Sequence, residues 1–215
     1  MHPNRKFHIE DREAMAALVR RTGFATLVVQ TDEGLRAVHL PVLLQGDRLR
    51  FHVARGNRVH AALLAGAEAI VVVNGADTYV SPDWYGQPGR VPTWNYVAVE
   101  MNGRAAPLGR EALIRLMDDL SAEHEEKLAP KTPWTRAKVD PALFEGLLKA
   151  ITGFEIEVAE WRGTAKLDQD KPDEVRARLA DAIAAAGWPE AAELVRSPAN
   201  VTAVSTPVLP RVPRP

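Results

Sequence analysis

The sequence predicts an α+β protein in which helices decorate an antiparallel β-barrel. Between residues 24 and 103, short stretches of alternating polar and apolar side chains follow one another with only brief turns between them, which favours an antiparallel meander. Helical patterns occur among these stretches without the regular strand–helix alternation of a doubly wound sheet. With 215 residues, the chain is long enough to bury one full core or two small ones.

The first element is a helix over residues 11–22, because Asp11 can cap it, apolar residues recur at helical spacing and Gly23 ends it. The hydrophobic period then changes to that of strands. We expect strands at 24–30 and at 35–44, the second interrupted by Pro41, and a third strand at 48–53.

A short helix at about 58–64 follows the third strand and stops before Gly66. The β-branched run at 69–73 is typical of a strand buried on both faces. Residues 81–92 form a loop rich in Gly, Pro and aromatic side chains, and residues 93–103 alternate again as a strand.

Helical patterns return at 110–127, 141–150 and 172–186, with one more strand at 154–158. We expect residues 1–196 to form a single domain with C-terminal helices. From residue 197 to 215 the sequence has no period and is rich in proline, which prevents helix and ladder pairing, so an extended or disordered tail is expected.

Composition argues against several classes of protein. The 27 basic and 28 acidic residues give a net charge of −1, and no basic cluster is free of nearby acids or prolines, so direct DNA binding has weak support. No apolar run is long enough for a membrane span, and the charged start is unlike a secretory signal. The absence of cysteine removes disulfides and thiolate metal sites. These features predict a cytoplasmic globular protein.

A metal site is not expected either. His39, His52 and His60 lack the i, i+4 spacing of a zinc-binding helix, and His124 has no second histidine near it. Neither a nucleophile elbow nor a phosphate-binding P-loop is present, so no catalytic residue can be named from the sequence.

The first candidate for a binding site is the segment His52-Val53-Ala54-Arg55-Gly56-Asn57, where a strand leads into a helix. Amides at a helix start attract anions, Arg55 offers a bidentate fork, and Asn57 can cap. This pattern favours a phosphate monoester as ligand. From the spacing alone, a capped strand-to-helix turn with a solvent-exposed arginine is the favoured alternative, because such turns are common.

The second candidate consists of two aromatic stretches, which contain Trp84, Tyr85, Trp94 and Tyr96. Aromatic rings mixed with Ser, Thr and Asn suit a flat π-system whose edge makes directed hydrogen bonds. The alternative is a loop whose rings plug the core or a subunit interface.

The third candidate runs from Lys166 to Lys171. Its lysine could contact a phosphate or the electron-rich edge of a ring. The same pattern is also typical of a solvated connection before a helix.

At these segments the sequence resembles the PaiB-type, FMN-binding family of negative transcriptional regulators. The similarity extends over about residues 7–171, and the pairing of Ser-Pro-Xaa-Trp-Tyr with Pro-Thr-Trp-Asn-Tyr makes it specific. The matching pieces are Phe7 with Asp11, His39 to Pro41, His52 to Asn57, Tyr79 to Tyr85, Val91 to Tyr96, Gly153 to Ile156, and Lys166-Leu167 with Gln169.

The resemblance implies a split β-barrel, a homodimer with FMN pockets at the subunit interface, and a bacterial cytosolic protein linked to repression of degradative-enzyme synthesis and sporulation. It implies that Arg55 and Asn57 hold the FMN phosphate. The full set expected to contact FMN is His39, Leu40, Pro41, His52, Val53, Ala54, Arg55, Asn57, Trp84, Tyr85, Thr93, Trp94, Asn95, Tyr96, Lys166 and Gln169.

Four positions depart from the family pattern. Asp168 and Asp170 replace a serine and an asparagine, and each carboxylate near the phosphate would be repulsive by about 1 kcal/mol at the surface. Arg58 and His60 replace a proline and a tryptophan and could offset that charge.

Three functions follow from this reading. The resemblance favours an FMN-binding transcriptional regulator. An FMN-dependent oxidoreductase of the split-barrel class is the first alternative, since these folds position flavin chemistry. A binding module with a vestigial flavin pocket is the second.

Overall fold

The computed structural model describes residues 2–201. The prolines on which the prediction of an extended tail rests lie outside the described residues, while residues 198–200 form a short 3₁₀ helix, η4 (Pro198–Asn200). Backbone contacts divide the described chain into two compact units. The first unit comprises residues 2–22, 73–100 and 162–201, and the second comprises residues 23–72 and 101–161. That residues 1–196 act as one domain stays a prediction.

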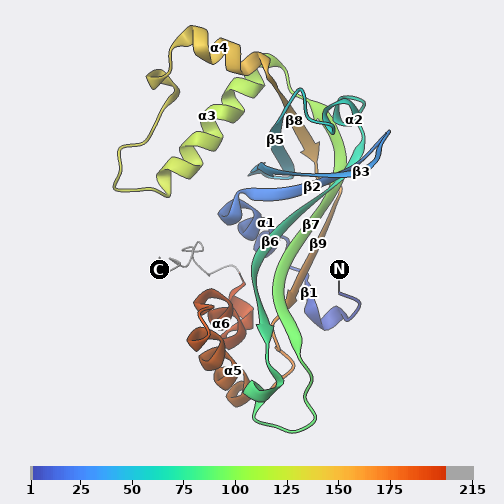
Figure 1. Ribbon diagram of the computed structural model, residues 1–215, viewed down its shortest axis with the longest axis vertical. Helices are drawn as coiled ribbons and strands as arrows, with labels where there is room; N and C mark the ends of the chain where they lie inside the picture. Colours follow the sequence, from blue (N-terminus) through green and yellow to red (C-terminus); the bar gives the residue numbers. More distant parts are fainter. Residues whose placement is uncertain (1, 202–215) are drawn as a thin grey trace. The chain divides into compact units, whose positions relative to one another are not determined.

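The second unit is a pair of antiparallel strand groups with helices (Figure 1). One group joins β2 to β3 and to the start of β6, and the other joins β5 to β4 and β8, with β8 also pairing the end of β7. The elements are β2 (Phe24–Thr31), β3 (Gly34–Pro41), β4 (Leu43–Gln45), β5 (Arg48–Ala54), α2 (His60–Leu64), α3 (Arg110–Glu126), η3 (Arg136–Lys138), α4 (Pro141–Lys149) and β8 (Ile151–Glu157), together with the start of β6 (Glu68–Val80) and the end of β7 (Thr93–Pro107).

Alternation along the strands builds the core of this unit. Every second residue of β5 points inward, so Leu49 and Phe51 are fully buried. Phe51 lies opposite Phe154 of β8, and the two rings stack with centroids 5.9 Å apart. Burying two large rings in this way stabilises the pairing by more than their area alone, because stacked aromatic pairs attract each other.

The first unit combines strands with a helical pair. It contains η1 (Arg5–Phe7), β1 (His8–Ile9), α1 (Arg12–Thr22), η2 (Pro82–Tyr85), β9 (Glu160–Lys166), α5 (Asp173–Ala185) and α6 (Pro189–Arg196), together with the end of β6 and the start of β7. β9 pairs with β1 and β7, and β6 pairs with β7. Asp11 caps α1 as predicted, because its Oδ1 accepts from the amides of Glu13 and Ala14 at 2.8 and 3.3 Å.

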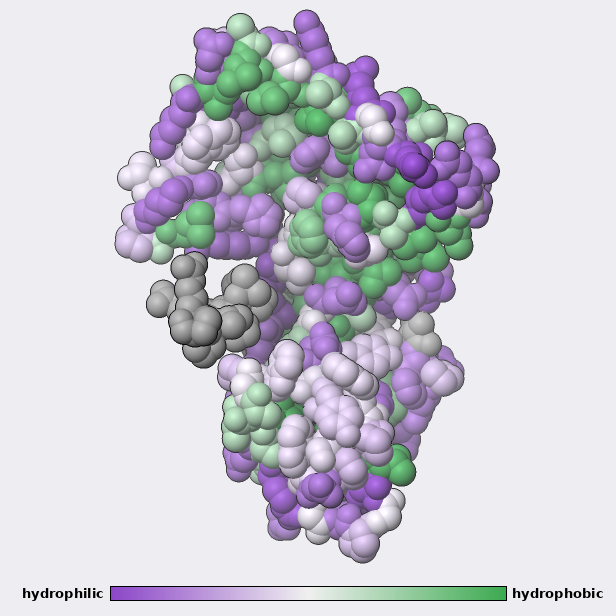
Figure 2. Space-filling model, in the orientation of Figure 1, coloured by the Kyte–Doolittle hydropathy of each residue, from purple (hydrophilic) through white to green (hydrophobic). Residues whose placement is uncertain are grey.

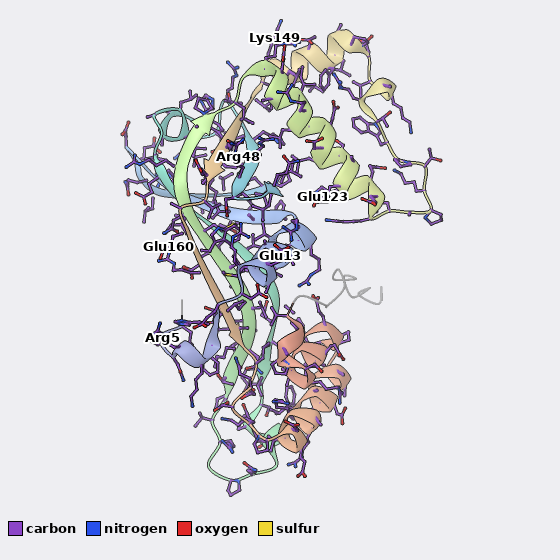
Figure 3. The ribbon with its side chains drawn as sticks, turned by 180° about the vertical axis from the view of Figure 1, so that it is seen from behind. Arg5, Glu13, Arg48, Glu123, Lys149 and Glu160 are labelled. Atoms are coloured by element: carbon purple, nitrogen blue, oxygen red, sulfur yellow. The ribbon has the colours of Figure 1, made fainter. Side chains whose placement is uncertain are left out.

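One glycine of the first unit is required by close packing. A Cβ on Gly163 of β9 would lie 2.7 Å from Cβ of Ile9 and 2.8 Å from Sδ of Met15. Any larger residue would push β1 and α1 away from β9. Charged positions of the same elements face outward, as Arg5 of η1 and Glu13 of α1 do (Figure 3).

The predicted α+β class is confirmed, and most predicted elements lie within three residues of their expected bounds. The run at 69–73 was predicted to be buried on both faces, and this is wrong: Ile70 is 40% exposed while Val71 is fully buried. Strand β9 and helix α6 were not predicted as separate elements. Gly163 and Ala165 weaken the strand pattern of β9, and Trp188 and Pro189 follow the glycine that ends α5.

None of the described helices combines the length and the apolar composition that a membrane crossing requires.

Candidate functional site

The sixteen residues predicted to contact FMN fall into two groups, one in each unit. The group in the second unit consists of His39, Leu40, Pro41, His52, Val53, Ala54, Arg55 and Asn57, and the group in the first unit consists of Trp84, Tyr85, Thr93, Trp94, Asn95, Tyr96, Lys166 and Gln169.

Arg55 stands in the turn that follows β5. Its amide donates to the carbonyl of Ala150 at 2.9 Å, and its Nε donates to the carbonyl of Ile151 at 3.2 Å. The first bond holds the backbone of the turn and the second holds the side chain through Nε, while the residue itself is exposed. Within residues 2–201 no carboxylate pairs with this guanidinium. Arg55 therefore offers an uncompensated positive charge and a donor fork to an anion.

Asn57 shapes the same turn. Its Oδ1 accepts from the amide of Val59 at 3.1 Å, and its carbonyl accepts from the amide of His60 at 3.0 Å. Helix α2 begins only at His60, two residues later than expected, and contains five residues. The expected contribution of a helix start to anion binding at Arg55 is therefore small, because the field of so short and distant a helix is weak.

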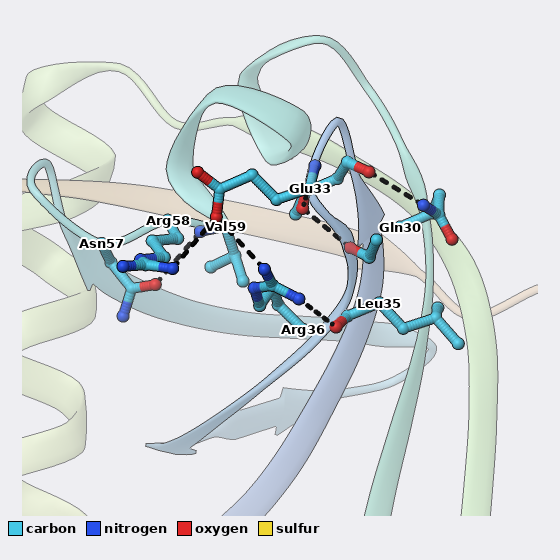
Figure 4. Close-up of polar contacts among 9 residues, drawn as sticks. Gln30, Glu33, Leu35, Arg36, Asn57, Arg58 and Val59 are labelled. Atoms are coloured by element: carbon cyan, nitrogen blue, oxygen red, sulfur yellow. Dashed lines mark hydrogen bonds and ion pairs between the residues drawn. The ribbon is translucent and has the colours of Figure 1, made fainter.

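Arg58, expected to offset nearby acidic charge, already has an acidic partner. Glu33, in the turn between β2 and β3, accepts from Arg58 Nη1 at 3.1 Å and from Arg36 Nη2 at 3.2 Å (Figure 4). His60 bonds through its Nε2 to Oγ1 of Thr152 at 2.9 Å. Of the two arginines in this turn, only Arg55 is left for a ligand.

The other predicted contacts in the second unit differ in accessibility. His39 is exposed, and its Nδ1 lies 3.0 Å from Oγ1 of Thr26 on the neighbouring strand. Leu40 and Val53 are 3% and 4% exposed, so a ligand could meet only their backbone. His52 is half-buried, its Nδ1 has no partner among the described residues, and burial lowers its pKa.

In the first unit, Asp168 joins two of the predicted contacts. Its Oδ1 accepts from the hydroxyl of Tyr85 at 2.9 Å, and its Oδ2 accepts from Nδ2 of Asn95 at 2.7 Å. All three side chains are buried, with Asn95 only 1% exposed. Burial is the main cause that raises the pKa of the Tyr85 hydroxyl above its usual value, and the charge of Asp168 is the second. The hydroxyl therefore keeps its proton and donates.

The segment after β9 is therefore not the solvated connection that the sequence also allowed. Asp168 adopts a left-handed conformation with φ of 55° and points its carboxylate into the unit. Two donors compensate its charge, while Asp170 pairs with Lys171 at 2.7 Å. The sequence could not give this outcome, since an aspartate in a turn is usually exposed.

Lys166 and Gln169 are also engaged within this unit. Lys166 Nζ donates to Oγ1 of Thr93 and to the carbonyl of Trp94, the latter at 2.9 Å. Gln169 accepts from the amide of Leu167 at 2.8 Å and donates to the carbonyl of Ala165 at 2.6 Å. The bonds of Lys166 connect the end of β9 to the start of β7, and those of Gln169 hold the turn after β9. Asp168 itself brings together two of the predicted contacts, Tyr85 and Asn95.

Three aromatic residues of the β6–β7 hairpin are more accessible. Trp94 is 54% exposed, and it meets Tyr79 edge to face with centroids 6.3 Å apart. Trp94 and Tyr96 line a groove of about 310 Å³ together with Asn74, Gly75, Asp77 and Val97. The sequence did not point to Asn74 or Asp77.

A larger hollow of about 1090 Å³ lies in the second unit, between α3, residues 127–140 and α4. Trp134 and Phe144 line it, and Arg136 stacks on the Phe144 ring at 5.1 Å. In the face drawn in Figure 2, hydrophobic residues reach the surface at α4, where Leu143 and Leu147 are 57% and 56% exposed. None of these residues was predicted to bind a ligand, because apolar helical positions are usually core.

Residues 1–160 match the family model described as "Putative FMN-binding domain". The chain is 31% identical over 176 residues to protease synthase and sporulation protein PAI 2 of Bacillus subtilis (strain 168), a match that covers 80% of this chain and 83% of that protein.

Two solved structures are similar in fold. The FAD and heme binding protein from Mycobacterium smegmatis gives a TM-score of 0.57 at 21% identity, covering 84% of this chain and 80% of that one. The flavocytochrome Anf3 from Azotobacter vinelandii gives 0.55 at 19% identity, covering 76% and 72%. The predicted split-barrel class is confirmed by these likenesses.

Taken separately, each of the two groups has the chemistry to contact one part of a phosphorylated planar molecule. An exposed guanidinium without an acidic partner can pair with a phosphate, and exposed indole and phenol rings can pack on a heterocycle. In the described residues no group of three His, Asp or Glu side chains could hold a metal ion.

Proposed function

Since the chain belongs to the family of FMN-binding domains that its residues 1–160 match, we propose that it is an FMN-binding regulator of the type represented by the B. subtilis protein of protease synthesis and sporulation. The observation that carries the proposal is the family match over a segment that includes Arg55, whose guanidinium is exposed and unpaired among the described residues.

Arg55 would pair with the FMN phosphate, and Asn57 would hold the turn that presents it. Trp94 and Tyr96 would contact the ring system, and the bonds of Asp168 to Asn95 and Tyr85 would fix the backbone on which these rings stand. The bound flavin would supply redox chemistry, which the protein only positions and tunes. The roles of the remaining predicted contacts stay predictions.

The spectrum of the purified chain tests flavin binding. We expect absorbance of a bound flavin between about 300 and 550 nm, either as purified or after soaking with FMN and removal of the excess. The same protein soaked with riboflavin, which lacks the phosphate, is the control and should retain less flavin. A preparation that takes up no FMN would contradict the proposal and favour a vestigial pocket.

We also propose that the protein is a homodimer. The outer face of the β3–β2–β6 sheet carries an apolar cluster at its centre: Val28 of β2 lies opposite Ala37 and Ile70, and Ile70 is 40% exposed. Exposed contiguous apolar surface of this kind is typical of an interface. His39, a predicted flavin contact, is on the same face because it pairs with Thr26.

Sedimentation measures this state directly. We expect twice the chain mass of 23.6 kDa for the unmodified protein and a shift toward the monomer for Ile70→Lys, since a buried unpaired ammonium is costly. Gln30→Lys on the same face is the control, because Gln30 is already polar and exposed. A monomer at micromolar concentration would exclude the dimer, and an unchanged Ile70→Lys dimer would exclude this face.

Direct binding to DNA has less support than a regulatory role. Helices α5 and α6 are joined by a three-residue turn that contains Gly187, as in DNA-binding helical pairs. However, Glu193 is exposed on α6, and Arg196 is paired with Asp181 at 2.8 Å. Gel-shift titrations at several salt concentrations decide the matter, and the absence of a sequence-dependent shift at micromolar protein would make any effect on transcription indirect.

A flavin-dependent oxidoreductase is the second candidate, favoured by the fold shared with two proteins whose names record flavin binding or a flavocytochrome. If the protein is such an enzyme, adding a nicotinamide donor should reduce the bound flavin and so remove its absorbance. A flavin that stays oxidised with that donor would leave the regulator as the better proposal.

A further inference from the structure

Strand β6 changes its inward-facing phase inside the first unit. Val73 is buried, and after it the buried positions are the even-numbered Thr78 and Val80 rather than odd-numbered residues. The neighbouring strand β7 keeps its odd-numbered positions buried from Asn95 to Met101, so the change in β6 indicates one extra residue, a β-bulge, between Val73 and Thr78. Gly75 is in this stretch, where a Cβ would lie 3.2 Å from Cβ of Val97 on β7.

The bulge coincides with the groove of about 310 Å³, whose lining includes Asn74, Gly75 and Asp77 from β6 and Trp94 and Tyr96 from β7. Bulges are common beside binding sites because they redirect side chains. Here the phase change brings Asp77 to the groove, alongside the exposed ring of Trp94.

Two polar side chains of this groove have no partner among the described residues. Within residues 2–201, the carboxylate of Asp77 has no ion pair or hydrogen bond, and neither has the side-chain amide of Asn74. Lys166, which bonds to the start of β7, donates from its ammonium to Oγ1 of Thr93 and to the Trp94 carbonyl, and it makes no ion pair with Asp77.

We infer that this groove binds a small organic cation, an alkylammonium or alkylguanidinium group. The π faces of indole and phenol rings attract such cations, and indole does so most strongly. A neighbouring carboxylate adds a charge-assisted hydrogen bond. A metal ion is less suitable, because beside the single carboxylate of Asp77 the groove supplies only the neutral oxygens of Asn74 and Tyr96 and not the larger set of oxygen ligands that a hard divalent cation takes.

The inference does not depend on flavin binding. It assigns a second class of ligand to β7. The family resemblance already relates the first residues of this strand, from Thr93 to Tyr96, to FMN. An anion is disfavoured beside Asp77 by charge, so the groove selects a ligand of the opposite sign to the FMN phosphate.

The test is an NMR titration of the Trp94 indole N–H with n-butylguanidinium and n-butylammonium chloride, before any FMN is added. The Trp94 signal is identified by its loss in Trp94→Leu. We expect saturable shifts for both cations and much smaller ones for n-butanol and butyrate. Asp77→Asn should weaken the affinity about three- to fivefold. Trp94→Leu, followed through other signals of the groove, should weaken it about two- to fivefold.

Asp83→Asn is the matched control, because Asp83 is an exposed acid of the same unit outside the groove, and it should leave the affinity unchanged. Equal shifts for the neutral alcohol and the cations, or an Asp77→Asn affinity equal to that of the unmodified chain, would overturn the inference. If the measured affinity falls as the protein concentration rises, a second copy of the chain competes for the groove. The cation that the groove binds is then an arginine or lysine side chain of that copy. Because flavin is absent, this result is separate from that of the FMN spectrum.

Discussion

Replacing Arg55 by alanine should weaken FMN binding by about 2–4 kcal/mol, or roughly 30- to 1,000-fold in the dissociation constant, because it removes a charge-assisted bidentate contact to the phosphate. The structure supports a large effect, since this guanidinium is fixed by its bond to the Ile151 carbonyl and has no acidic partner in the described chain. A fluorescence titration of FMN measures the change.

Arg58→Ala is the matched control for this experiment. Arg58 is three residues further along the same turn, and its charge is compensated by Glu33. Its removal should change FMN affinity less than about threefold, because a compensated, exposed pair contributes little. If Arg55→Ala also changed the affinity less than twofold, the phosphate would have to bind elsewhere. Riboflavin should bind both variants equally, because it carries no phosphate.

Replacing Asp168 by alanine should lower the free energy of unfolding by about 2–4 kcal/mol, because it leaves the Tyr85 hydroxyl and the Asn95 amide buried without an acceptor. For a chain of this length, that corresponds to a fall in melting temperature of roughly 4–16 °C. Thermal unfolding followed by circular dichroism measures it.

Two variants separate the causes of this loss. Asp168→Asn keeps a residue that tolerates the left-handed backbone at φ of 55° but can accept from only one of the two donors well, so a smaller loss is expected. Asp170→Ala removes an exposed acid whose ion pair within residues 2–201 is with Lys171, and it should cost less than about 1 kcal/mol. A melting temperature unchanged in Asp168→Ala would show that the three-residue network adds nothing to stability.

The local elements were largely predictable from the sequence because their signals are local. Capping by Asp11, the alternation from Trp94 to Met101 and the apolar spacing of α3 each depend on neighbours in the chain. β9 was missed for the same reason: Gly163 gives no local strand signal, and its role is to let Ile9 and Met15 approach. That role exists only after segments more than a hundred residues apart have packed.

The candidate site shows the same division. The sequence predicted that Arg55 lies in a turn after a strand and that aromatic residues lie on β7. It also indicated the family to which these residues point. The sequence did not show which charged side chains remain available to a ligand. Glu33, which is 25 residues from Arg58 in the chain, accepts a hydrogen bond from it. The Asp168 side chain is buried and accepts from Tyr85 and Asn95 instead of facing solvent.

By itself, then, the sequence determined the α+β class, the family and the residue types that can hold an anion and a planar ring. Only the tertiary structure decided which of those side chains are engaged, which are exposed, and that Asp77 and Asn74 share a groove with Trp94. The physical reason is that the residue type sets which bonds a side chain can form. Its burial and its hydrogen-bond and ion-pair partners depend on segments that are distant in the chain.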